Sequence, residues 1–168
     1  TGGSAGIYKC PADRSMTRRG NGGPMVPRIR SLSMNSWMGL NEGVHTWFGG
    51  PEFRGYLKSS DIVDPGPSMT WVLIDEHPDS LNDGFFCIDM KGYPDPARTA
   101  LPDVPSSAHN QACGLSYADG HSEIKKWLDP RTAPPVAYKA SNPAMGSAVQ
   151  PNNPDVVWLW ERTTRFVD

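Results

Sequence analysis

Prolines and glycines divide this sequence into short pieces, which limits the folds that it can adopt. The 168 residues include 17 prolines and 17 glycines, together about a fifth of the chain, against roughly 12% in an average protein. Proline ends helices and interrupts strand ladders, and glycine weakens both. We therefore expect one α+β domain over residues 1–168, with a small antiparallel sheet, long loops and little helix.

Four stretches have the composition of β-strands. Residues 31–39 alternate with period two, 70–76 are β-branched and aromatic, and 85–90 are mostly apolar. Residues 113–127 predict a hairpin around Asp119 and Gly120, because an Asp-Gly pair accepts the positive φ of a tight turn.

The remaining stretches predict mostly loops. Residues 10–31 are rich in Pro, Gly and Arg without apolar periodicity, which indicates a long loop. Residues 58–63 fit either a helical turn or an edge strand. The C-terminal residues predict a helix after Pro154, with Asp155 as its N-cap.

Charge and hydropathy argue against a nucleic-acid partner and against a membrane-spanning helix within this sequence. The formal net charge is −2 and the basic residues form no stripe, so no nucleic-acid partner is expected. No apolar run in this sequence reaches the ~20 residues that a membrane-spanning helix needs.

An acidic segment, DEHPDSLNDG, lies between two of the expected strands. Oxygen ligands gathered on a loop suit Ca²⁺, although the spacing is not that of an EF-hand. The candidate calcium ligands are Asp75, Glu76, Asp79, Asn82 and Asp83. The alternative is an Asx-turn loop whose carboxylates accept backbone N–H bonds. Asp75 and Glu76 are adjacent on a strand and are expected to point to opposite faces, so they do not form a glycosidase pair.

His109, Asp119 and His121 are the second candidate site. Two imidazoles and a carboxylate could bind a transition metal. Because Asp119 and Gly120 are expected at the turn tip and His109 before the strand, we instead expect a structural motif of His109, Asp119, Gly120 and His121. The sequence contains no G-x-S-x-G or H-E-x-x-H signature and no local Cys/His signature, so no enzymatic activity is predicted.

The three cysteines lack the C-x-x-C spacing of zinc and redox sites. Cys87 and Cys113 fall on expected strands and form either a bridge or a pair of buried free thiols. Cys10 is then the odd cysteine, or the partner of either.

Several separated stretches together resemble one family. They are YKCPADRS, RSLSMNSWMG, DEHPDSLNDGFF, HNQACGLSYADGHSEIKKW and DVVWLWERTT, and His109 is followed after nine residues by Asp119-Gly120. In this order they are similar to the prepilin-type H-X9-DG proteins of Verrucomicrobia and Planctomycetes, which are related to the pseudopilins of type II secretion.

The resemblance implies a pseudopilin-like head, normally preceded by a cleaved leader and a long hydrophobic helix that anchors it in the inner membrane. It also implies a sheet face left apolar where that helix belongs, and Ca²⁺ in a loop of the sheet region. Such a protein would reside in the periplasm or at the cell surface and contact other pilin or pseudopilin subunits, the secretion apparatus or secreted cargo.

Two alternative functions come from other classes. A secreted carbohydrate-binding module would use a stacking platform of Trp37, Trp47, Phe48, Phe53 and Tyr56. Those aromatic residues could instead pack as a small core under the long loop. A metal-dependent hydrolase would use His77, His109 and His121.

Overall fold

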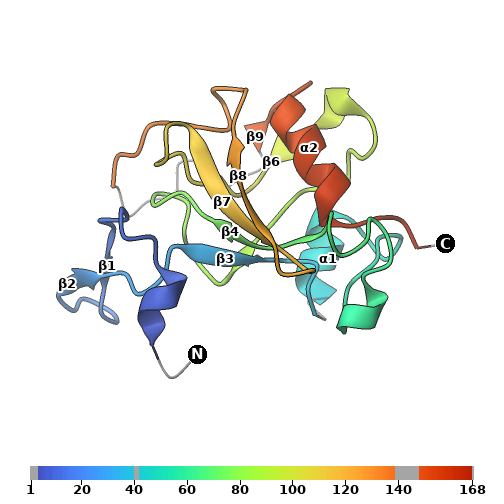
Figure 1. Ribbon diagram of the computed structural model, residues 1–168. Helices are drawn as coiled ribbons and strands as arrows, with labels where there is room; N and C mark the ends of the chain where they lie inside the picture. Colours follow the sequence, from blue (N-terminus) through green and yellow to red (C-terminus); the bar gives the residue numbers. More distant parts are fainter. Residues whose placement is uncertain (1–3, 40–41, 139–147, 168) are drawn as a thin grey trace.

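The computed structural model describes residues 4–39, 42–138 and 148–167 (Figure 1). It has the mixed α+β composition expected from the sequence, mostly sheet with two α-helices. Its helices are α1 (Glu42–Phe48), α2 (Pro154–Thr163) and the short 3-10 turns η1 (Ala5–Tyr8), η2 (Ser59–Asp61) and η3 (Pro96–Arg98). Its strands are β1 (Met16–Arg18), β2 (Met25–Pro27), β3 (Leu32–Asn35), β4 (Trp71–Asp75), β5 (Phe85–Phe86), β6 (Ala100–Leu101), β7 (Ala112–Tyr117), β8 (Ser122–Lys126) and β9 (Ala148–Val149).

A five-stranded sheet forms the centre of the domain, in the order β5-β3-β4-β7-β8. The pairs β3–β4, β4–β7 and β7–β8 are antiparallel, which confirms the small antiparallel sheet. The edge strand β5 runs parallel to β3. β5 is shorter than the expected strand over 85–90, because the Cys87 N–H donates to the side chain of Asp103 (2.6 Å) instead of continuing the ladder.

One face of this sheet packs against α2. Apolar residues of β4 and β7, such as Trp71, Ile74 and Leu115, belong to one cluster with Val156, Leu159 and Trp160 of α2. Each of these six side chains is buried. Burial of large aromatic and aliphatic side chains provides the main favourable free energy of folding, and here it fixes α2 on the sheet.

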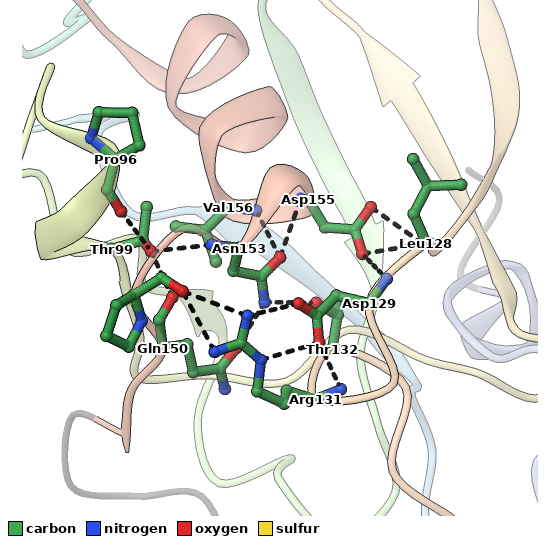
Figure 2. A network of polar contacts seen from close by, with 11 residues as sticks. Pro96, Thr99, Leu128, Asp129, Arg131, Thr132, Gln150, Asn153, Asp155 and Val156 are labelled. Carbon is green, nitrogen blue, oxygen red and sulfur yellow. Dashed lines mark hydrogen bonds and ion pairs between the residues drawn. The ribbon is translucent and has the colours of Figure 1, made fainter.

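A buried polar network starts α2 (Figure 2). The helix follows the expected Pro154, but its N-cap is Asn153 and not Asp155 as predicted. Asn153 accepts hydrogen bonds from the N–H groups of Asp155 (2.9 Å) and Val156 (3.4 Å). Asp155 lies in the first turn, where its carboxylate accepts N–H bonds from Leu128 and Asp129. Both residues are cap types, and tertiary contacts decide their roles.

Two elements differ from the expected loops. Residues 10–31 contain the hairpin of β1 and β2, which lies apart from the central sheet at the left of Figure 1. The stretch 39–68 contains α1, and residues 58–63 form the 3-10 turn η2, one of the two expected possibilities. No helix in the described part of the chain has the length and apolarity to cross a membrane.

Candidate metal centre at the end of strand β4

Strand β4 ends in a run of buried polar side chains. Asp75, Glu76 and His77 are exposed by only 5%, 1% and 1% of their surface. Asp75 and Glu76 have different surroundings, since Asp75 lies beside His109 and Glu76 accepts a hydrogen bond from the Ser33 hydroxyl. Polar groups removed from water are costly unless they are paired, so the partners of each group decide its role.

Asp75 belongs to a cluster of three metal-ligating residues. The Cys10 Sγ lies 3.2 Å from the Nε2 of His109. The same Nε2 lies 3.8 Å from Oδ2 of Asp75. Ligand atoms of Cys10, Asp75 and His109 all lie within 4.8 Å of one another. This is the only such cluster of His, Cys, Asp and Glu side chains in residues 4–39, 42–138 and 148–167.

Backbone hydrogen bonds bring the three residues together. The N–H of Cys10 donates to the Ser31 hydroxyl (2.8 Å), and the N–H of Ser31 donates to the carbonyl of Tyr8 (2.8 Å). These bonds attach the N-terminal segment to the start of β3, which is the neighbour of the end of β4.

The antiparallel pairing of β4 and β7 places His109. Because β7 starts where β4 ends, the loop before β7 passes over Asp75, and the Ser106 N–H donates to the Asp75 carbonyl (2.7 Å). Asn110 and Gln111 then adopt positive φ values of 57° and 61°. Two consecutive non-glycine residues in this conformation are uncommon, and they form the tight turn in which the His109 N–H faces the Ala112 carbonyl (3.4 Å).

The Asp75 carboxyl group is incompletely paired. Its Oδ1 is buried and has no hydrogen-bond partner among the described residues. Burial raises the pKa of Asp75 above its ordinary value, against the opposing effects of the Ser31 side chain and of the nearby His109. The cluster borders a cavity of about 620 Å³, which Cys10, Asp75 and His109 all line.

The geometry of these three side chains favours metal binding over nucleophilic catalysis. In a nucleophile–His–carboxylate relay, the carboxylate holds the ring nitrogen opposite the one that faces the nucleophile. Here the Cys10 Sγ and Asp75 Oδ2 approach the same nitrogen, Nε2 of His109. Three ligand atoms within 4.8 Å of one another form an arrangement that a metal ion could occupy.

The predicted calcium ligands have separate partners. Asp79 accepts a bond from the Ala137 N–H (2.6 Å), Asn82 from the Asp83 N–H (2.6 Å), and Asp83 from the Phe85 N–H (2.8 Å). Of the five residues, only Asp75 is part of the described cluster. These contacts are those of the alternative, an Asx-turn loop. Calcium binding here stays a prediction.

The predicted H-X9-DG motif divides between two places. At the hairpin tip, Gly120 has a φ of 94°, and Asp119 Oδ1 lies 2.6 Å from Nδ1 of His121. Hydrogen bonds from the His121 backbone N–H and then from its side chain lower the pKa of Asp119. His109 has different neighbours, Cys10 and Asp75. The sequence therefore identified His109 as a candidate but did not indicate Cys10 as its partner.

Several residues of the alternative functions are buried inside the fold. His77 is buried, with its Nε2 3.2 Å from the Pro134 carbonyl and its Nδ1 accepting the Asp79 N–H, and burial lowers its pKa. Within the suggested aromatic platform, Trp37, Phe53 and Tyr56 are buried, while Trp47 is 67% exposed. The three buried rings are unavailable to stack on a sugar.

All three cysteines are free thiols. The bridge between Cys87 and Cys113 is therefore absent, and the other expected possibility, free thiols, holds. Cys113 is buried and Cys87 is half-buried, and burial raises the pKa of both thiols.

Comparison of the chain with models of known protein families, with curated proteins and with solved structures gives no significant match.

Proposed function

We propose that this chain is the pseudopilin-like head of a filament subunit, in a type IV pilus-like or type II secretion assembly, and that it acts through protein contacts. The observation that supports the proposal is the face of the central sheet opposite α2. That face carries the cavity of about 620 Å³, and its lining includes apolar side chains from three strands. We call this cavity the sheet groove.

Alternation along the strands gives the groove its shape. Leu32 of β3, Leu73 of β4 and Ile124 of β8 line it, and Ile124 is 77% exposed. Between them β7 contributes the small residues Gly114 and Ser116. A Cβ added at Gly114 would meet no atom within 4 Å. Small residues between larger apolar ones leave room for an element that packs closely on a sheet.

The proposed occupant is an apolar helix that precedes this chain in a longer protein. The turn η1 adjoins the groove, because Ile7 lines it, as does the following Lys9. A helix that enters through η1 would therefore run directly onto the sheet groove. The same helix would anchor the subunit in the inner membrane before assembly, with the head in the periplasm or at the cell surface. Its partners would be other subunits, the secretion apparatus or secreted cargo.

The coding sequence upstream of residue 1 provides the first test. The proposal requires an apolar segment of ~20 residues, enough to span a membrane as a helix, within a short distance of Thr1. An upstream sequence without such a segment would overturn it.

The second test uses that longer protein. Gly114→Glu places a charge in the sheet groove, where the head itself has open space, so the thermal midpoint of the head should be retained while filament assembly is lost. Gly114→Ala is the matched control and should assemble. Normal assembly of the Glu variant, measured by electron microscopy and cross-linking, would contradict the proposed packing.

A further inference from the structure

We propose that Cys10, Asp75 and His109 form a binding site for one divalent transition-metal ion, with Zn²⁺ as the best match. The inference rests on the geometry and chemistry of these three side chains, which also line the sheet groove, and its tests use the metal and do not depend on filament assembly.

The separations between the ligand atoms fit a bound ion. An ion held tetrahedrally at ~2.0–2.3 Å has ligand atoms about 3.3–3.7 Å apart. The distance from Cys10 Sγ to His109 Nε2 is 3.2 Å, and that from Nε2 to Asp75 Oδ2 is 3.8 Å. Side-chain adjustments of a few tenths of an ångström would therefore bring both pairs to the ideal separation. The third pair, Cys10 Sγ and the Asp75 carboxylate, lies within 4.8 Å and would close by at most about 1.3 Å.

The unpaired oxygen of Asp75 is an independent indication. The residue is 95% buried, being exposed by 5%, yet its Oδ1 has no hydrogen-bond partner in the described part of the chain. A buried carboxylate with an unsatisfied oxygen is costly unless a cation compensates it. Oδ2 is the oxygen that faces His109 and Oδ1 is the unpaired one, so an ion beside His109 supplies that compensation when the carboxylate binds it through both oxygens.

The donor set selects the type of metal. One thiolate, one imidazole and one carboxylate suit a borderline ion such as Zn²⁺, whereas Ca²⁺ requires six to eight oxygen ligands. The three protein ligands leave a fourth position, and the cavity that they line provides space for water there. The His109 side chain is 42% exposed, so an ion can reach the site from solvent.

The metal would connect two parts of the fold. Cys10 belongs to the N-terminal segment, whereas Asp75 ends β4 and His109 precedes β7. A bound ion therefore ties that segment to the centre of the sheet and stabilises the folded state by linkage.

The test starts from reduced, metal-free protein. Calorimetric titration with Zn²⁺ should give one site per chain, and Zn²⁺ should raise the thermal midpoint, with Ca²⁺ and Mg²⁺ producing neither effect at this site. Co²⁺ should give the absorption of a tetrahedral thiolate complex, which reports directly on Cys10.

Matched variants identify the ligands. Cys10→Ser and His109→Ala should each weaken Zn²⁺ binding by more than about 100-fold, since even loss of a residue that supports a ligand costs 10–100-fold. Cys87→Ser and His121→Ala remove the same residue types elsewhere and should bind Zn²⁺ normally. Asp75→Asn should weaken binding as well, and the exposed His109 keeps the test valid if that buried variant does not fold.

Equal Zn²⁺ affinity in Cys10→Ser and the unchanged protein, or Co²⁺ spectra without a thiolate band, would overturn the site. If the protein assembles into filaments but binds no metal, the metal site is wrong and the filament proposal stands. If it binds metal but never assembles, the filament proposal is wrong and the metal site stands.

Discussion

The N-terminus of α2 and the end of β4 both bury polar side chains, but they pair them to different extents. At α2, the Asn153 side chain accepts two N–H bonds and donates to Thr132 (2.9 Å) and Gln150 (2.6 Å), as Figure 2 shows. At β4, Asp75 Oδ1 and Glu76 Oε1 have no partner among the described residues. Burial alone therefore does not distinguish the two clusters, whereas the completeness of their hydrogen bonding does.

The difference has a chemical consequence. The α2 network is explained by folding alone, because its groups satisfy one another. Glu76 instead keeps a proton, since burial, together with the charge of Asp103, raises its pKa to about 8. Asp75 lies beside two further metal ligands and takes an ion in our proposal. Incomplete pairing thus leaves the end of β4 able to take up a proton or an ion from solvent, which the α2 network is not.

The largest predicted effect is at the paired cluster. Asp155 accepts N–H bonds from Leu128 (2.9 Å) and Asp129 (2.8 Å), and lies 3.5 Å from Nζ of Lys125. Asp155→Ala leaves two N–H groups and a charge without their partner, so we expect a loss of about 3–5 kcal/mol in the free energy of unfolding, measured by urea denaturation.

Two control variants are compared with Asp155→Ala for their loss in the free energy of unfolding. Asp155→Asn keeps an acceptor oxygen and should lose less. Asp129→Ala removes a carboxylate that accepts the backbone N–H of Arg131 and pairs with its exposed guanidinium. It should have a smaller effect, since both groups of Arg131 can turn to water. If Asp155→Ala is no less stable than Asp129→Ala, the network is not the structural element that we describe.

The second prediction concerns the buried carboxyl group of Asp103. Burial raises the pKa of Asp103 from its ordinary value of 3.8 to about 6. The folded protein therefore holds a proton that the unfolded chain releases between these values, and this group's contribution to stability falls as the pH rises through that window. Asp103→Asn removes the effect and keeps an acceptor for the Cys87 N–H.

We expect Asp103→Asn to be more stable than the unchanged protein at pH 7, by on the order of 1–2 kcal/mol. The advantage should shrink toward pH 4. Urea denaturation at both pH values in the presence of EDTA measures it without interference from metal. A variant that is less stable at pH 7 would show that Asp103 is stabilised as a carboxylate, and an advantage independent of pH would show that its pKa is not raised by folding.

Sequence patterns predicted the strands with buried residues and the marked turn. β4 and β7 follow from compact apolar runs, and β8, which is almost entirely exposed, follows from the Asp-Gly turn. The strands β1 and β2 left no such signal, because their side chains are almost all exposed on both faces. The seven-residue helix α1 contains Gly43 and is too short for a helical period to be evident.

The metal cluster was beyond prediction from spacing. Cys10, Asp75 and His109 are far apart in the sequence and come from a loop, a strand end and a second loop. The available signal was the pairing of β4 with β7, which places a residue just before β7 beside the end of β4. No strand pairing indicated the position of Cys10. That position depends on the hydrogen bond from the Cys10 N–H to the Ser31 hydroxyl.

The smallest predicted effect is at the hairpin tip, where polar groups are paired but exposed. Gly120 has a φ of 94°, a conformation in which a Cβ is strained although the surrounding space is open. Gly120→Ala should therefore lower the free energy of unfolding by about 1 kcal/mol, measured by thermal denaturation.

Gly114 of the same hairpin is the matched control. Its added Cβ would also meet open space, and its φ lies outside the positive region, so Gly114→Ala should be neutral or slightly stabilising. Equal losses at the two glycines would mean that strand propensity and not turn conformation decides the cost. A loss at Gly120 alone assigns the Asp-Gly part of the motif to the turn, and leaves His109 as the residue of that motif available for binding.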